Sequence, residues 1–88
     1  MTWIKFNNAI INLENVREIR LEHEKIRFFF SKKSGLISET EETFIVFEDE
    51  KIAEKIFDYI STKLLVNSNF IDLDECLKAL KNESKKTK

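Results

Sequence analysis

The stretch Phe44–Leu65, FIVFEDEKIAEKIFDYISTKLL, constrains the fold of this chain more than any other segment. A nearly continuous apolar run, Thr43–Phe47, leads into three acidic residues, and apolar residues at helical spacing follow directly. Such a run is typical of an interior strand with apolar contacts on both faces. Acidic residues suit the start of a helix, and Asp49 is a good N-cap, so the main helix is predicted to begin near Glu48 or Asp49.

The predicted main helix has one apolar side and one polar side. At about 100° per residue, its apolar side chains fall within an arc of about 160°. These residues are Ile52, Ala53, Ile56, Phe57, Tyr59, Ile60 and Leu64. A helix with an apolar side of this width is expected to pack across one face of a sheet.

The segments before this stretch read as strands separated by turns. The predicted strands are residues 2–6, 9–13, 16–22 and 25–31, and the predicted turns are Asn7–Asn8, Glu14–Asn15 and His23–Glu24. The strands 16–22 and 25–31 alternate and are joined by a short polar link, which predicts a hairpin. Residues 32–42, KKSGLISETEE, contain the only glycine and several Ser, Thr and Glu, so they predict a long loop. Alternatively, Leu36 and Ile37 extend a strand partway into it.

The end of the chain predicts a second, shorter helix. Asn67–Asn69 ends the main helix, Phe70–Ile71 is an apolar lead-in, and Asp72 is the expected N-cap. A narrow apolar stripe follows, formed by Leu73, Cys76, Leu77 and Leu80. Residues 83–88, ESKKTK, predict a flexible Lys-rich tail, which leaves residues 1–82 as a single domain. The predicted fold class is α+β: an antiparallel β-meander of four to five strands, one long helix packed on one face, and a short C-terminal helix.

Residue types that carry catalysis or bind metals are scarce in this chain. The single histidine, His23, and the single cysteine, Cys76, lie far apart in sequence, whereas a structural zinc site needs four converging ligands. Cys76 falls on the predicted apolar stripe, which fits a packed residue better than a nucleophile. A single glycine excludes a Gly-rich phosphate loop. We therefore predict that the protein is not an enzyme and has no metal and no cofactor.

The same sequence features bear on where the chain resides. One cysteine cannot form an internal disulfide, which fits a reducing compartment. No apolar run approaches the roughly 20 residues that span a bilayer, and the first residues, MTWIKFNN, lack the features of a signal peptide. We therefore expect a cytoplasmic protein with no membrane partner.

Charge is nearly balanced overall, with 15 basic and 16 acidic residues, but it is unevenly distributed. Residues 34–50 hold six acids and no base. Helix capping and solvation explain such a segment, and a contact surface for a basic partner is the alternative. A basic stripe along the predicted hairpin would contain Arg17, Arg20, Arg27, Lys32 and Lys33. With the Lys-rich tail, this stripe supports weak nucleic-acid binding as an alternative function, although a pI near 5.9 argues against it.

Apolar residues on the uncovered sheet face give the leading functional hypothesis. If the main helix covers the face that bears Ile19, Leu21, Phe28 and Phe30, the other face carries Phe29 with either Ile45 and Phe47 or Phe44 and Val46. Trp3 can join either side. An exposed apolar patch usually marks an interface. We therefore predict a protein-interaction module that forms a homodimer or binds another protein, and the predicted interface residues are Trp3, Phe29, Ile45 and Phe47.

The segment Ile10–Ile19, IINLENVREI, followed by a Phe-rich strand and by FIVFEDEKIAEKIF, resembles a group of small uncharacterised bacterial and phage-type proteins. In that group an INLxNV-like strand, a hairpin and a strand–acid–helix segment form a β-meander closed by a helix. The resemblance covers about residues 3 to 62. It implies the fold and no activity.

Overall fold

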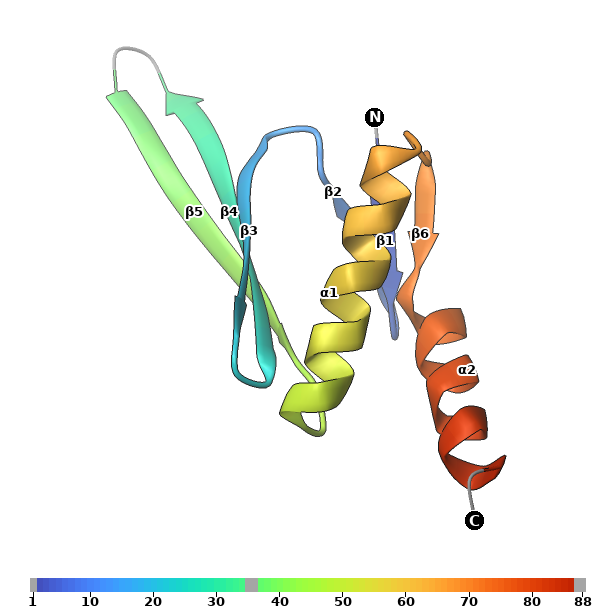
Figure 1. Ribbon diagram of the computed structural model, residues 1–88. Helices are drawn as coiled ribbons and strands as arrows, with labels where there is room; N and C mark the ends of the chain where they lie inside the picture. Colours follow the sequence, from blue (N-terminus) through green and yellow to red (C-terminus); the bar gives the residue numbers. More distant parts are fainter. Residues whose placement is uncertain (1, 35–36, 87–88) are drawn as a thin grey trace.

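The computed structural model describes residues 2–34 and 37–86, with the side chains of residues 2–31 and 41–82. In chain order the elements are β1 (Trp3–Phe6), β2 (Ala9–Asn12), β3 (Val16–Glu22), β4 (Lys25–Ser34), β5 (Ile37–Val46), α1 (Glu50–Leu65), β6 (Phe70–Asp72) and α2 (Leu73–Lys86) (Figure 1). The α+β class is confirmed, with one long helix and a shorter C-terminal helix.

The strands form two three-stranded sheets, where the sequence predicted one meander. In the small sheet β1 lies between β2, which is antiparallel to it, and β6, which is parallel to it. In the large sheet β4 lies between β3 and β5, and both pairs are antiparallel. The turn after Leu13 takes the chain from one sheet to the other, and the Asn12 side chain stabilises it by accepting a hydrogen bond from the Glu14 N–H at 2.9 Å. Alternation predicts strands but does not reveal which strands pair.

The predicted long loop over residues 32–42 is wrong. Strands β4 and β5 form one long hairpin whose register is unbroken from the pair Lys25↔Val46 to the pair Ser34↔Ile37. The alternative, in which a strand includes Ile37, is closer to the structure, whereas Leu36 lies outside the described residues. Figure 1 shows the outer end of this hairpin standing clear of α1. The strands there need no apolar side facing the helix, and their sequence has no apolar pattern.

Segment Phe70–Asp72 forms β6, where the sequence predicted only an apolar lead-in to a helix. It pairs with β1 through Trp3↔Phe70 and Ile4↔Ile71. The prediction of Asp72 as the N-cap of α2 is confirmed, because its Oδ1 accepts a hydrogen bond from the Glu75 N–H at 3.1 Å. Helix α2 continues to Lys86, so most of the predicted tail, 83–88, is helical, and residues 87–88 lie outside the described part.

Helix α1 begins where the acidic segment predicts. The Asp49 side chain caps it by accepting a hydrogen bond from the Ile52 N–H at 2.9 Å. The helix ends at Leu65, and Asn67 takes a positive φ of 55° in the turn that follows. Asn7 and His23 also have positive φ, which confirms the two predicted hairpin turns.

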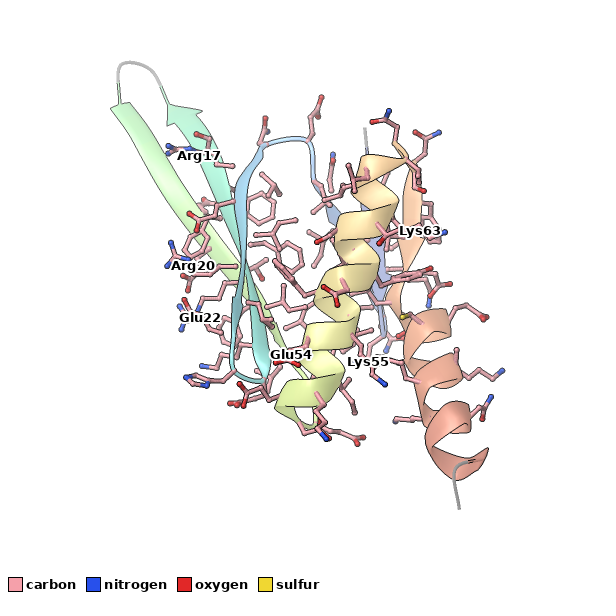
Figure 2. All side chains as sticks on the ribbon, in the orientation of Figure 1. Arg17, Arg20, Glu22, Glu54, Lys55 and Lys63 are labelled. Carbon is pink, nitrogen blue, oxygen red and sulfur yellow. The ribbon has the colours of Figure 1, made fainter. Side chains whose placement is uncertain are left out.

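One apolar core joins both sheets and both helices. Its buried residues are Ile4, Leu13, Ile26, Phe28, Ile45, Phe47, Ala53, Ile56, Ile60, Ile71 and Leu73. Figure 2 shows side chains filling the space between the large sheet and α1. Because side chains from the small sheet belong to the same cluster, we expect the two sheets to unfold together.

The prediction that Ile45 and Phe47 lie on the uncovered sheet face is wrong. Each is 6% exposed and belongs to the core. Residue Ile45 pairs with the fully buried Ile26, and directly paired residues share a face of the sheet. Phe44 and Val46, each 50% exposed, therefore occupy the outer face, as in the alternative that the sequence left open.

Candidate interaction surfaces

The outer face of the small sheet carries three exposed apolar side chains. Ile4 and Ile71 are fully buried, so alternation turns their neighbours Trp3 and Phe70 outward, where they are 37% and 50% exposed. These two residues pair directly across β1 and β6. On β2, Ile10 is 59% exposed and pairs with Lys5. We call Trp3, Ile10 and Phe70 the Trp3 face.

The apolar sides of both helices lie against the side of the small sheet opposite the Trp3 face, while the first turn of α2 reaches Lys5 at the end of the sheet. Leu73 of α2 and Ile56 of α1 belong to the same buried cluster as Ile4, which points away from Trp3. The side chains of Trp3, Ile10 and Phe70 are each more than a third exposed, so this face is open to solvent.

An ion pair fixes the end of this sheet against α2. The Lys5 ammonium bonds to the Asp74 carboxylate, which also accepts a hydrogen bond from the Asn7 N–H at 2.9 Å. The hydrogen bond from Lys5 lowers the pKa of Asp74, and the Asn7 amide lowers it further; the same contact raises the pKa of Lys5. The pair holds the first turn of α2 beside the β1–β2 hairpin.

We expect Asp74→Asn to lower the melting temperature slightly at neutral pH and not at all in strong acid. The folded-state pKa of Asp74 lies below its unfolded value, so its contribution is present above about pH 4 and is lost as pH falls through the folded pKa. The effect should be small because the pair is exposed. Thermal unfolding across this pH range measures it, with Asp58→Asn as the control. A difference that stays constant into strong acid would contradict this expectation.

The outer face of the large sheet also carries aromatic residues, but basic groups cover them. The Arg20 guanidinium lies 5.0 Å from the centre of the Phe29 ring. The Lys25 ammonium lies 5.1 Å from the centre of the Phe44 ring, and Arg27 approaches the same ring at 6.0 Å. Contacts of this kind stabilise an exposed aromatic ring in water. This face can therefore remain solvated.

The predicted basic stripe on the large sheet is only partly assembled. Arg20 lies 2.7 Å from Glu18, and Arg27 lies 2.9 Å from both Glu22 and Glu42. Figure 2 shows Arg17, Arg20 and Glu22 on the side of this sheet that is turned away from α1. The side chains of Lys32 and Lys33 lie outside those described. Because Arg20 and Arg27 are paired with acids, the described part of the stripe offers little excess charge to a phosphate backbone.

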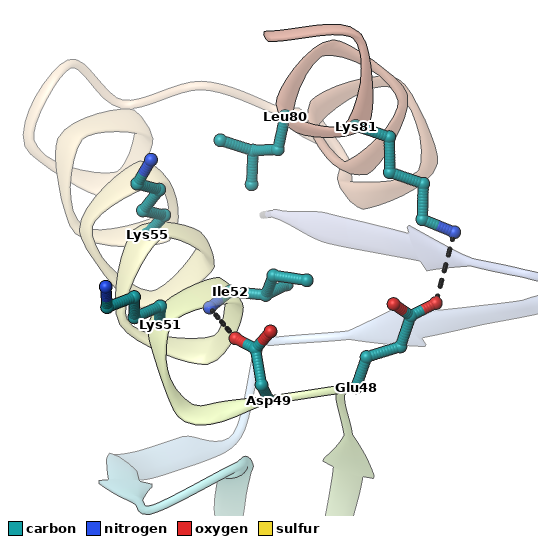
Figure 3. Close-up of a pocket in the computed structure, with 7 residues that line it drawn as sticks. All are labelled: Glu48, Asp49, Lys51, Ile52, Lys55, Leu80 and Lys81. Carbon is teal, nitrogen blue, oxygen red and sulfur yellow. Dashed lines mark hydrogen bonds and ion pairs between the residues drawn. The ribbon is translucent and has the colours of Figure 1, made fainter. Parts of the chain in front are cut away.

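A hollow of about 480 Å³ lies where the start of α1 faces α2. Its lining residues are Glu48, Asp49, Lys51, Ile52, Lys55, Leu80 and Lys81 (Figure 3). Both acids already have structural partners, because Asp49 caps α1 and Glu48 pairs with Lys81 at 3.4 Å. The two carboxylates of the hollow are therefore engaged in a helix cap and in an ion pair.

The residues that the sequence singled out for chemistry lie apart from this hollow. His23 is exposed at the β3–β4 turn, 3.9 Å from Glu50. Burial in an apolar site raises the pKa of the Cys76 thiol, which disfavours the reactive thiolate. Among the described residues, no group of three or more His, Cys, Asp or Glu side chains could hold a metal ion. Neither α1 nor α2, as far as the described residues extend, is long and apolar enough to cross a membrane.

Sequence reasoning found Trp3 but missed Ile10 and Phe70. Phe70 was assigned to a helix lead-in, and Ile10 to a strand with no assigned inner face. The available signal was alternation, because Phe70 adjoins Ile71 and Ile10 adjoins Ile11, but it identifies the outer face only once the pairing of β1 with β2 and β6 is known. Comparison of the chain with protein-family models, with curated proteins and with solved structures found no match.

Proposed function

We propose that this chain is a small protein-interaction module whose contact surface is the Trp3 face. The observation that carries the proposal is that Trp3, Ile10 and Phe70 are exposed together on the outer side of a sheet whose inner side is buried. Large aromatic side chains on an open surface are typical of contact sites, and tryptophan is prominent among residues that dominate binding energy.

The contrast between the two sheets supports this choice of surface. On the large sheet, basic side chains cover Phe29 and Phe44. On the small sheet, the nearest outward base, Lys5, is engaged by Asp74. The Trp3 face thus lacks the cover that makes the other aromatic face compatible with water.

The size of the face indicates a weak contact. Three strands of about four residues, spaced about 4.8 Å apart, cover about 200 Å² of sheet. A stable interface buries about 800 Å² on each partner. A homodimer formed through this face alone should therefore be transient, whereas a protein partner that reaches beyond the face could bind more tightly.

Self-association is the form of the proposal that can be tested directly. We expect the mass from sedimentation velocity to rise between micromolar and near-millimolar concentrations, and the emission of Trp3 to shift to the blue as its ring is buried. Trp3 is the only tryptophan, so the signal reports this face alone. Ile10→Lys places a charge in the contact at an exposed edge position, and it should abolish both changes.

Val46→Lys is the matched control, because Val46 is similarly exposed but lies on the outer face of the large sheet. It should leave both changes intact. A strict monomer with constant Trp3 emission would contradict self-association, and equal effects of the two variants would show that the Trp3 face is not the contact.

A further inference from the structure

Strand β5 forms an open edge of the large sheet. It has one neighbour, β4, and its ten residues pair with β4 without a register shift. Along Ile37–Val46, one row of backbone N–H and C=O groups therefore faces away from β4, with no strand against it in the described ranges.

This edge lacks most of the devices that discourage strand addition. Strand β3, at the opposite edge, is shorter, has a register shift between Val16 and Glu18, and bears two arginines. The β5 sequence, ISETEETFIV, has no proline, lysine or arginine, and its pairing is regular throughout. Long and regular edges are templates for an added strand.

The outer end of the β4–β5 hairpin would gain stability from a third strand. Pairing with β3 reaches only as far as Phe30, so beyond it β4 and β5 form a two-stranded ribbon. Figure 1 shows this ribbon extending away from α1 and from the small sheet. Two-stranded ribbons are marginally stable in water, and a third strand makes them substantially more stable.

Charge indicates the class of strand that would fit. Strand β4 carries four bases and no acid, whereas β5 carries three acids and no base. The ion pair between Arg27 and Glu42, at 2.9 Å, shows how this alternation stabilises the hairpin. A basic strand beside β5 would continue the pattern, while the acidic β5 of a second copy would oppose it.

We propose that β5 accepts an extended basic segment of a partner protein as a fourth strand of the large sheet. Backbone hydrogen bonds along Ile37–Val46 supply the affinity, and the acids of β5 select a basic partner. The edge is separate from the Trp3 face, so this inference goes beyond the proposed function.

A synthetic peptide in which lysine alternates with valine and threonine tests the proposal on the full chain. We expect the peptide to slow hydrogen exchange of β5 edge amides, measured by NMR, and to bind more weakly as salt rises. The same peptide with glutamate in place of lysine should bind at least about tenfold more weakly, because it sets like charges opposite each other.

The double charge reversal Glu39→Lys and Glu41→Lys should weaken binding of the lysine peptide by at least about tenfold. Glu54→Lys, which reverses an exposed acid on α1, is the control and should leave the affinity unchanged. Ile10→Lys should also bind normally, and this separates the result from any failure of the Trp3 face.

The proposal would be overturned by equal binding of the lysine and glutamate peptides, by protection confined to amides outside β5, or by an affinity unchanged in the double reversal. Growth in mass with concentration that needs no peptide and is lost in the double reversal would identify a second copy as the occupant, and would equally overturn it.

Discussion

Phe28→Ala should lower the free energy of unfolding by about 4 kcal/mol, because it removes a large side chain from the centre of the core. Phe28 is fully buried on the central strand of the large sheet and pairs with Ile19 on one side and Thr43 on the other. A chain of this length is stable by about 5 to 10 kcal/mol, so the variant should lose roughly half of its stability or more. Urea unfolding followed by circular dichroism measures the loss.

Phe44→Ala is the matched control, because it removes the same side chain from the outer face of the same sheet. Phe44 is half exposed, and the basic groups of Lys25 and Arg27 lie over its ring. Its loss should cost about 1 kcal/mol or less. If the two substitutions cost the same, the assignment of inner and outer faces in the large sheet would be incorrect.

Local signals in the sequence predicted the elements well. Helix α1 was foreseen from a 3.6-residue apolar period and from Asp49, whose cap depends only on residues three positions away. The turn at Asn7 was foreseen because Asn reaches positive φ more readily than most residues, and the turn at His23 because a short polar link joins two alternating runs. In each case the physical cause lies within a few residues of chain.

Features that depend on pairing could not be read from the sequence. Phe44–Phe47 is apolar at every position, so alternation alone could not decide which residues face the core. The pair Ile26↔Ile45 decides it, and that pair joins residues far apart in sequence. The Trp3 face has the same origin, because Phe70 reaches Trp3 only through the parallel pairing of β6 with β1.

The polar segment after Ser31 shows a second limit of sequence patterns. Its Ser, Thr and Glu residues resemble a loop because a strand is usually recognised by the face it buries. The outer end of the β4–β5 hairpin stands clear of α1, and its two strands are held together by their continuous antiparallel pairing instead. A strand that lies clear of the helix needs no apolar side facing it, so its sequence gives no apolar signal to detect.

Ile4→Ala is expected to lower the free energy of unfolding by about 3 kcal/mol, and to do so for both sheets at once. Ile4 is fully buried on the central strand of the small sheet, between Ile11 and Ile71, and it belongs to the same core cluster as Phe28. Because that cluster joins the sheets, a cavity at Ile4 should also weaken the packing of the large sheet.

Two probes measured on the same urea series distinguish one cooperative unit from two. Trp3 emission reports the small sheet, and far-ultraviolet circular dichroism reports the whole chain, so their midpoints should coincide in the wild type and shift together in Ile4→Ala. Ile10→Ala, on the exposed side of β2, is the matched control and should cost less than about 1 kcal/mol. If Trp3 emission in Ile4→Ala changed at a lower urea concentration than circular dichroism, the small sheet would be a separate, weaker unit. The Trp3 face would then belong to a sheet that can unfold independently, and binding at this face would be coupled to the folding of the small sheet alone.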